Sequence, residues 1–402
     1  MMILEGIRVI DWSQWHAAPH AAVMLTDLGA EVIHIEDPIH GDPWRGTKTL
    51  LGVPLQLPHG RNLMFEDLNR NKLGIRLNVK NPKGRDIVYE LAKKSDVFLT
   101  NYRGAEKIGL DYESLRQINP KLIYTLGTGF GMRGPDKDIG SLESTAYARS
   151  GAMMAAGEEG TQPVYLQPGM ADRITSVYLA YGTLAALLGR QRLGLGQMVT
   201  VSQFGAMIVV QGTGVLPTLW MGQDTRKQCR NNQPNPLTNW YMCKDKKRIM
   251  LCLFQSDKYW SKLCMALGLP ELANDPRFVN AEKRENNCIS LISILDDVFA
   301  LRTYDEWDKA LKKIGGFIYS PLNSYSDLAS DEQALANQYI VDWDHPDLGQ
   351  VKYVGHPVEF SHTPQAPLKP APHFGESTEQ VLIDILGLTW EEINLLKDEG
   401  II

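Results

Sequence analysis

The sequence predicts an α/β protein with a largely parallel sheet, together with a smaller α+β domain. Over roughly the first 200 residues, short apolar runs alternate with helical stretches, a pattern typical of consecutive α/β units. From about Gly212 onward, Gly, Pro, Asn and Gln accumulate as far as Asn231–Pro236, which is typical of a boundary loop. We therefore expect a large domain that starts with residues 1–210 and is completed by residues 326–402, with a small domain at 211–325 between them.

Five short apolar runs in the first part of the chain are predicted as strands of the sheet. They are Ile7–Asp11, Glu31–Glu36, Gly74–Asn78, Val97–Thr100 and Leu122–Leu126. Between the third and fourth runs, Asn81 and Pro82 form a helix start with Pro at the first helical position. The longest helical stretch covers 172–192, and Gly189–Gly196 ends it.

The second part of the chain predicts hairpins and short helices. A hairpin over Trp240–Leu253 turns at Lys244–Lys246, and helices follow near 256–267, 279–299 and 303–314. A second hairpin turns at Pro346–Gly349. The proline-rich segment Pro364–Pro372 should run extended over a neighbouring surface, and Thr389 with Glu392 forms a capping box that opens the last helix.

Composition excludes several classes of function. The chain has 41 Lys and Arg against 47 Asp and Glu, so the net charge of −6 carries no electrostatic footprint for nucleic acid. No apolar run reaches the length of a membrane span, and the first residues lack the pattern of a signal peptide, so we expect a cytoplasmic protein. Five cysteines without C-x-x-C and nine histidines without H-x-x-x-H predict neither disulfides nor a metal site. Small-molecule partners are favoured.

A glycine-rich run, Gly129-x-Gly131-x-x-Gly134, follows a predicted strand and matches the dinucleotide-binding pattern. Its context does not match, because Pro135 follows where a helix should open and the first strand ends in Ser13–His16 without glycine. Nicotinamide binding is therefore not expected. Gly129 and Gly131 still allow a backbone to approach a ligand closely.

Polar groups collect at the ends of predicted strands, where α/β folds place ligands. His16 follows the first strand and is either a ligand-binding group or a turn histidine with satisfied hydrogen bonds. Asn69–Lys72 contains Arg70 and Lys72, which suit a phosphate but also fit a solvated turn. The same two interpretations apply to Asn101, Tyr102, Arg103 and Lys107 at the end of the fourth strand.

Asp172 lies immediately before the longest predicted helix. An Asp at this position is most often a helix N-cap. The positive end of a helix also keeps a carboxylate ionised, and a nucleophilic carboxylate must be ionised. The two interpretations are compatible.

Many motifs in order along the chain resemble the class III CoA-transferases, the family of formyl-CoA and carnitine CoA-transferases. The matching segments, which run from Leu4 to the C-terminus, are Leu4–Asp11, Ala18-Pro19, Asp27–Ile33, Gly41-Asp42, Asn69–Lys72, Gly109–Tyr112, Asn119–Tyr124, Gly129–Gly131, Gly134-Pro135, Ser150-Gly151, Gly194–Val199, Pro236-Leu237, Asp275–Phe278, Glu306-Trp307 and Leu386–Leu388.

This resemblance implies a Rossmann-like large domain, an interlaced homodimer or a pair with a homologous subunit, and acyl-CoA and carboxylic acid substrates. It implies that CoA is a substrate and that no cofactor is tightly bound. It also implies that Asp172 attacks a donor acyl-CoA thioester to form a mixed anhydride, and that CoA thiolate then converts the anhydride into an aspartyl thioester. An acceptor carboxylate reverses these steps.

The resemblance assigns further residues to the site. CoA-binding positions map onto Lys72 and Lys107, and Asn101 and Tyr102 match positions near the pantetheine or adenosine. His16 is expected to orient an intermediate or a substrate carboxylate, and Glu143 to be a second polar anchor beside Asp172. The expected site thus comprises the catalytic residues Asp172, His16 and Glu143 and the CoA-binding residues Arg70, Lys72, Asn101, Tyr102, Arg103, Lys107, Gly129 and Gly131.

Two rival functions follow from the same resemblance. An α-methylacyl-CoA racemase needs a His–Asp pair where this chain has Leu142 and Glu143, and leucine cannot carry a proton. A non-catalytic partner subunit would have lost the nucleophile, whereas Asp172 is present. Both features favour CoA transfer, and the identity of the exchanged acids is left open.

Overall fold

A computed structural model describes all residues, 1–402, as two compact units. The large unit comprises Met1–Met154, Val164–Thr225 and Val341–Ile402, and the small unit comprises Ala155–Pro163 and Arg226–Ile340. The two main boundaries are predicted near residues 210 and 326, about 15 residues earlier in each case. The first difference arises because the glycine-containing stretch Gly212–Met221 is a helix of the large unit and not part of the linker.

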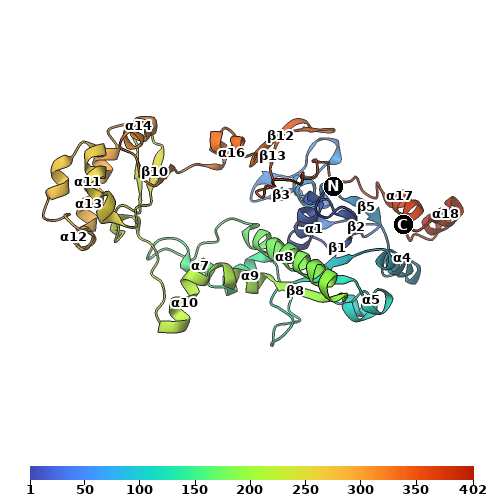
Figure 1. The fold of residues 1–402 in the computed structure, drawn as a ribbon. Helices are drawn as coiled ribbons and strands as arrows, with labels where there is room; N and C mark the ends of the chain where they lie inside the picture. Colours follow the sequence, from blue (N-terminus) through green and yellow to red (C-terminus); the bar gives the residue numbers. More distant parts are fainter. The chain divides into compact units, whose positions relative to one another are not determined.

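A six-stranded parallel sheet forms the centre of the large unit (Figure 1). Its strands are β1 (Arg8–Trp12), β2 (Glu31–Glu36), β5 (Leu73–Arg76), β6 (Val97–Thr100), β7 (Ile123–Thr128) and β8 (Met198–Ser202). The order β5-β2-β1-β6-β7-β8 reverses its direction of growth between β1 and β6, so the expected Rossmann-like topology is confirmed. The first five strands are predicted, and β8 is missed because it pairs with β7, about 70 residues earlier in the chain.

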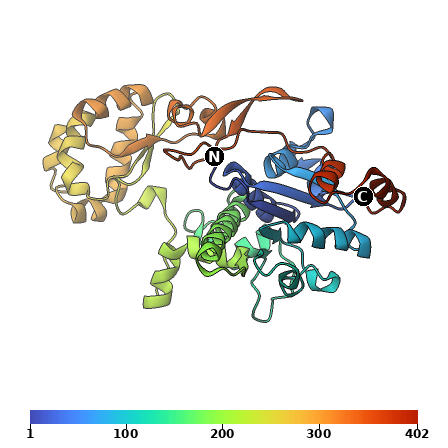
Figure 2. The same cartoon turned by 45° about the vertical axis from the view of Figure 1, so that its right-hand side comes forward.

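Helices cover both faces of this sheet. The large unit contains α1 (Ala17–Asp27), α2 (Pro43–Gly46), α3 (Leu63–Asn69), α4 (Pro82–Lys93), α5 (Tyr112–Ile118), α6 (Glu143–Arg149), α7 (Ala152–Ala155), α8 (Met170–Leu193), α9 (Gln203–Val210), α10 (Gly212–Met221), α17 (Thr378–Asp384) and α18 (Trp390–Asp398). Figures 1 and 2 show α8 alongside α1 on one face.

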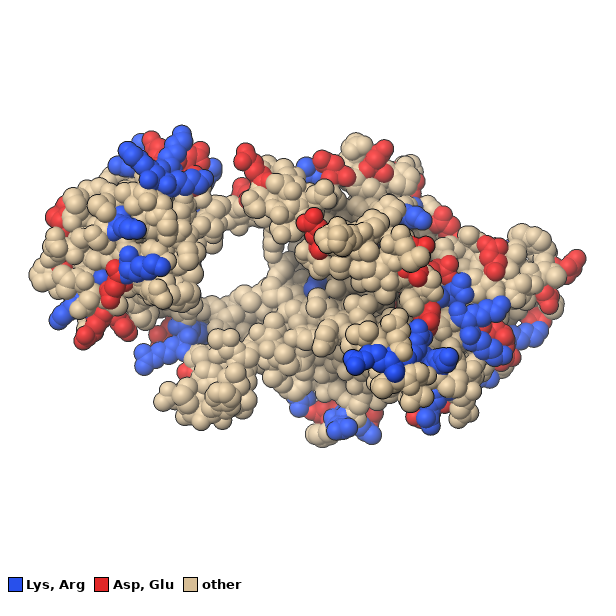
Figure 3. All heavy atoms as spheres, viewed as in Figure 1, with Lys and Arg blue, Asp and Glu red and all other residues tan.

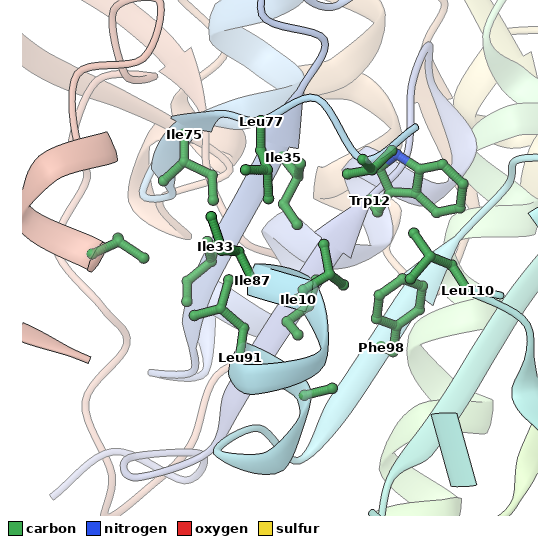
Figure 4. Packing of buried hydrophobic residues seen from close by; sticks show 14 of the residues in the cluster. Ile10, Trp12, Ile33, Ile35, Ile75, Leu77, Ile87, Leu91, Phe98 and Leu110 are labelled. Atoms are coloured by element: carbon green, nitrogen blue, oxygen red, sulfur yellow. The ribbon is translucent and has the colours of Figure 1, made fainter. Parts of the chain in front are cut away.

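Consecutive residues of a strand belong to two separate hydrophobic clusters, one on each face of the sheet. Val9 of β1 packs with α1 and α8, whereas the next residue, Ile10, packs with α4 on the opposite face. Figure 4 shows Ile10 beside Ile87, Leu91 and Phe98 in this second cluster. The C-terminal helices α17 and α18 pack into the same cluster, so the end of the chain completes the large unit.

The tail before these helices runs extended over β5, as predicted. Residues 364–372 have no helix or strand. Asn71 holds them, because its side-chain amide donates to the carbonyl of Pro367 at 3.0 Å and its carbonyl accepts from Lys369 N–H at 2.6 Å. Gly74 leaves the space that the ring of Pro372 occupies.

The small unit joins a three-stranded antiparallel sheet to helices. Its elements are β9 (Trp240–Met242), β10 (Arg248–Leu251), β11 (Tyr319–Pro321), α11 (Ser256–Leu267), α12 (Ala281–Asn286), α13 (Cys288–Phe299), α14 (Tyr304–Ile314), α15 (Tyr325–Leu328) and α16 (Glu332–Ala336). The predicted first hairpin is confirmed, with Lys246 in its turn at φ 65°. The helix predicted at 279–299 is interrupted at Asn287, which ends α12 and precedes α13.

Two further hairpins are β3 (Thr49–Leu50) with β4 (Val53–Pro54), and β12 (Ile340–His345) with β13 (Gly349–Val354). The second is the hairpin predicted at Pro346–Gly349, and the capping box of Thr389 and Glu392 is also confirmed. Acidic and basic side chains are interspersed on the face shown in Figure 3. No single helix has the length and apolar composition to cross a bilayer; α9 and α10 reach it only as a pair bent by 80°.

Candidate active site

The carboxyl ends of the parallel strands bring several predicted site residues to one edge of the sheet. Ser13–His16 follow β1, Asn101 and Tyr102 follow β6, and Gly129 follows β7. In doubly wound sheets this edge is where ligands bind, near the point at which the strand order reverses. The side chain of Asp172 reaches the same region from the start of α8, since it contacts a residue that follows β8.

Asp172 lies in the first turn of α8 and is not its N-cap. The helix begins at Met170, two residues earlier than predicted, after Gly169, whose φ of 88° is strained for other residues. The Asp172 side chain accepts no backbone N–H. Its Oδ1 instead accepts a hydrogen bond from the side-chain amide of Gln203 at 2.5 Å, and its Oδ2 lies 3.9 Å from Nδ1 of His16. The carboxylate is therefore not occupied by capping.

Burial, followed by the nearby carboxylate of Glu143, raises the pKa of Asp172 to about 7. The hydrogen bond from Gln203 and the positive charge of Arg173 act in the opposite direction but do not cancel these effects. From the sequence, the helix terminus is expected to keep this carboxylate ionised. The structure instead places it near half ionisation at neutral pH, because loss of water outweighs the helix dipole.

Glu143 caps the helix that carries Asp172. This buried carboxylate at the start of α6 accepts hydrogen bonds from the N–H of Gly169 at 2.6 Å and of Ala171 at 2.7 Å, and from the hydroxyl of Tyr165 at 2.8 Å. The two backbone N–H groups are donors that a helix N-terminus leaves without partners inside the helix. A residue from another helix thus performs the capping that the sequence suggests for Asp172 itself.

His16 lies in the loop between β1 and α1, beside Gly169. A side chain at position 169 would come within 3.1 Å of the imidazole Cε1. Burial, followed by the positive charge of Arg173, lowers the pKa of His16 to about 4, so the imidazole is neutral at pH 7. Its Nε2 is buried without a hydrogen-bond partner. The interpretation as a turn histidine with satisfied hydrogen bonds is therefore wrong.

The loop that carries His16 is held rigidly. Asn101 accepts from the N–H of Gln14 at 3.0 Å and donates to its carbonyl at 2.7 Å. Asp42 accepts from the N–H of Trp15, which has a φ of 65°. Asn101 therefore connects the loops after β1 and β6, the two strands at the reversal point.

The other residues after β6 lie at the surface of the same edge. Tyr102 stacks on Trp12 with ring centres 4.4 Å apart. Arg103 donates to the carbonyl of Asp138 at 2.6 Å, and Lys107 is an exposed residue of the 3₁₀ turn Ala105–Ile108. Arg103 and Lys107 thus provide two cations at the surface.

Arg70 and Lys72 lie in the interior instead. The Arg70 guanidinium makes two hydrogen bonds to Asp27, at 2.5 and 2.8 Å. The Lys72 ammonium contacts Asp11 and Asn69, each at 2.8 Å, and two backbone carbonyls. An ammonium has three hydrogens, and all of them have oxygen partners here. In this structure neither cation is available to a phosphate, which differs from the expectation and identifies both as supports of the fold.

The glycine-rich run after β7 does not open a helix, as the sequence context predicts. The next helix, α6, begins only at Glu143. Gly129 is required by close packing, because a Cβ there would lie 2.1 Å from Cβ of Ser141. Gly131 has a φ of 101°, which favours glycine. No group of three or more His, Cys, Asp or Glu side chains is arranged as a metal site would require.

Two contacts of this site are not predicted from the sequence. Gln203 contacts Asp172, and Tyr165 contacts Glu143. The only available signal for Gln203 is its position directly after a strand, and that strand, β8, is itself not predicted. No local pattern marks Tyr165.

The fold and the site together define a doubly wound α/β protein with a partly buried carboxylate at the carboxyl edge of its sheet. A family model described as CoA-transferase family III matches residues 4–378. The chain therefore belongs to CoA-transferase family III, and it is an enzyme of the CoA-transferase class.

Individual relatives match over nearly their whole length. The (R)-2-hydroxy-4-methylpentanoate CoA-transferase of Clostridioides difficile is 35% identical over 100% of both chains. The cinnamoyl-CoA:phenyllactate CoA-transferase of Clostridium sporogenes is 33% identical over 99% of this chain and 97% of the relative. The crystal structure of a CAIB/BAIF family protein from Brucella suis superimposes with a TM-score of 0.83 at 27% identity, over 96% of this chain and 99% of the other.

Proposed function

We propose that this enzyme moves CoA from an acyl-CoA donor to a free carboxylic acid through covalent intermediates on Asp172. The observation that carries the proposal is the division of roles between two carboxylates. Glu143 caps α8, and Asp172 is left with an oxygen, Oδ2, that has no hydrogen-bond donor within normal distance. An ionised carboxylate with such an oxygen is a competent nucleophile.

The proposed reaction balances at each step. Asp172 attacks the thioester carbon and expels CoA thiolate, which leaves a mixed anhydride. The thiolate then attacks the aspartyl carbonyl and releases the donor acid, which leaves an aspartyl thioester. An acceptor carboxylate reverses both steps and departs as the new acyl-CoA. A pKa of about 7 suits a group that must be both nucleophile and leaving group near neutral pH.

CoA is a substrate in this scheme, and no tightly bound cofactor is needed. Its anionic part would lie against the exposed cations Arg103 and Lys107, with Asn101 and Tyr102 beside its chain. Gly131 would let backbone groups approach the reacting thioester, while Gly129 leaves room for Ser141 beside the site. These assignments rest on the shared location at the sheet edge.

The acceptor acids are proposed to be 2-hydroxy acids. Two relatives carry (R)-2-hydroxy-4-methylpentanoate and phenyllactate in their names. In this chain, the imidazole of the neutral His16 lies next to Asp172, and its Nε2 is buried without a hydrogen-bond partner. A substrate that supplies one more hydrogen-bonding group would satisfy this nitrogen. His16 is thereby proposed to orient the acid that attacks or leaves.

A homodimer, or a pair with a homologous subunit, is also proposed. Large apolar side chains remain exposed on α8 and α10, including Val177, Tyr181, Leu188, Leu219 and Trp220. Trp220 is 80% exposed. Large apolar side chains exposed on these two helices favour burial against another chain. Light scattering on the purified protein should give twice the mass of the chain, and a monomer would contradict the proposal.

The decisive experiment compares Asp172→Ala with the wild type in an exchange assay. Acyl-CoA donors are mixed with a panel of free acids that includes 2-hydroxy acids and their deoxy analogues, and the products are identified by mass spectrometry. We expect loss of exchange in Asp172→Ala and full exchange in the control Asp344→Asn, an exposed aspartate on β12. Retained exchange in Asp172→Ala would show that another group is the nucleophile.

A heavy-water experiment separates transfer from racemisation. The position expected to hold a racemase base is Leu142, which is apolar and exposed beside Glu143. We expect no deuterium at the α-carbon when acyl-CoA is incubated without an acceptor acid. Rapid α-deuteration would overturn the transferase proposal.

A further inference from the structure

Gln203 is the first residue of α9, directly after β8, and it holds one oxygen of Asp172. Its amide Nε2 donates to Asp172 Oδ1 at 2.5 Å, and its amide oxygen accepts from the hydroxyl of Ser141 at 3.3 Å. The two contacts agree on the orientation of the amide, because an ionised carboxylate only accepts hydrogen bonds. The amide therefore presents an N–H to the carboxylate.

We propose that Gln203 is a catalytic residue that makes Oδ2 of Asp172 the nucleophile and stabilises the negative charge that develops on Oδ1. This inference rests on the proposed function. It deepens that function by assigning different roles to the two oxygens of the carboxylate and a donor to one of the tetrahedral intermediates.

The two carboxylate oxygens have different surroundings. Oδ1 is bound by the Gln203 amide, and Oδ2 lies 3.9 Å from Nδ1 of His16, beyond hydrogen-bond distance. Lone pairs that accept a strong hydrogen bond are less available for attack, so the oxygen facing His16 reacts. The other oxygen then becomes the carbonyl oxygen of the anhydride.

The Gln203 amide is placed to act in the second step. When CoA thiolate adds to Cγ of Asp172, a C–S bond forms and the C=O electron pair moves onto Oδ1. The hydrogen bond from the Gln203 N–H to Oδ1 already exists, and it strengthens as negative charge develops on Oδ1. A donor that behaves in this way is an oxyanion-hole donor. Collapse of the intermediate re-forms the C=O bond, breaks the Cγ–Oδ2 bond and releases the donor carboxylate with that electron pair.

Close packing supports the position of Gln203. The carbonyl of Gly129 accepts from the N–H of Phe204 at 3.0 Å, and Ser202 caps α9 by accepting from the N–H of Gly205 at 3.0 Å. Gly129 also leaves the space for Ser141. Gly129 of the glycine-rich loop thus helps to position Ser141, which packs against it, and Gln203, whose neighbour Phe204 it binds.

The test is Gln203→Met, which keeps a similar unbranched side chain but removes the amide. We expect kcat to fall about 100-fold, as on removal of a single oxyanion donor, while KM for acyl-CoA changes less than about 2-fold. Rapid-quench mass spectrometry with acyl-CoA alone should show correspondingly slower formation of the aspartyl thioester. The acid limb of the kcat profile should move to higher pH, because the lost hydrogen bond favours the ionised carboxylate.

Matched variants separate this effect from a loss of structure. Gln191→Leu changes an exposed glutamine on α8 and should leave kcat unchanged. Ser141→Ala removes the hydroxyl that contacts the amide oxygen, together with its contacts to Leu142 and Thr145, and should lower kcat by a smaller factor than Gln203→Met. Circular dichroism and the thermal midpoint establish that each variant is folded, and Ser141→Ala provides the kinetic test if Gln203→Met does not fold.

The outcomes distinguish this inference from the proposed function. Suppose that Asp172→Ala is inactive while Gln203→Met keeps kcat within about 2-fold of the wild type, or changes only KM. Gln203 then has no catalytic role, and the proposed function stands. If Ser141→Ala is the kinetic test, an unchanged kcat overturns the inference. If Asp172→Ala remains active, the proposed function itself fails, whatever Gln203→Met does.

Discussion

Glu143 holds the helix start that carries Asp172 and at the same time raises the pKa of Asp172. The distances of 2.6 and 2.7 Å from its carboxylate to two backbone N–H groups fix the first turn of α8. Its negative charge, added to burial, disfavours ionisation of the second carboxylate. One residue thus determines both the place and the protonation of the proposed nucleophile.

Replacing Glu143 by Gln should separate these two effects. The amide keeps the shape but lacks the charge that raises the pKa of Asp172, so the acid limb of the kcat profile should move to lower pH. Gln also offers only one oxygen where three donors converge, which should cost about 1–3 kcal/mol of unfolding free energy. The exposed control Glu159→Gln should change neither quantity. An acid limb that stays in place would exclude the electrostatic role of Glu143.

Asp172 should make the folded state less stable as pH rises. Its pKa is about 7 in the folded protein against an ordinary 3.8, so the folded state binds the proton more tightly than the unfolded state. The cost of ionising it appears above pH 3.8 and is complete above pH 7. We expect Asp172→Asn to raise the unfolding free energy by about 2–4 kcal/mol at pH 8 and to have little effect near pH 4. Equal stability of the two proteins in chemical denaturation at pH 8 would contradict the raised pKa.

Lys72→Met should affect stability, whereas Lys107→Met should affect CoA binding. Burial alone would raise the pKa of Asp11, but Lys72 and His34 outweigh it and hold that pKa below its ordinary value. The stabilisation is therefore present above pH 3.8 and is lost as the pH falls below it. Removing the ammonium leaves a buried carboxylate without its cation, at a cost of about 3–5 kcal/mol.

Thermal unfolding and KM for acyl-CoA together test this pair of variants. Lys107 is exposed in its 3₁₀ turn, so Lys107→Met should keep the thermal midpoint and raise KM. The opposite assignment, a normal midpoint with raised KM in Lys72→Met, would show that Lys72 leaves the interior to contact CoA.

Gly129→Ala should disturb the site through packing. The new methyl group would lie 2.1 Å from Cβ of Ser141, so the loop that orients Gln203 must move. We expect kcat to fall about 10-fold or more, in line with the effect of small displacements at reacting groups. Gly46→Ala is the control, because a Cβ at Gly46 meets no atom within 4 Å. Unchanged kcat in both variants would mean that the Ser141 loop does not position the site.

Much of the fold could be predicted from local patterns. Five strands of the large sheet, the hairpin turning near Asp245 and the helix from Thr303 onward all depend on residues close together in sequence. Apolar periodicity and capping signals carry this information directly. Strand β8 escapes prediction because its partner, β7, is separated from it by the whole of α8.

The candidate site was only partly predictable for the same reason. Its location followed from residues at strand ends, and Asp172, His16 and Glu143 are gathered there. The burial of Lys72 and Arg70 was not predictable, because a polar turn and an internal ion pair have the same local sequence pattern.

The sequence by itself determined the α/β architecture, the family motifs and the carboxylate at the start of the long helix. The tertiary structure alone decided what that carboxylate does, because its partners come from distant elements. Glu143 of α6 takes over the helix cap, and Gln203 after β8 binds one oxygen of Asp172. Periodicity reports which face of an element is buried, whereas the partner of a buried polar group depends on which elements meet in three dimensions.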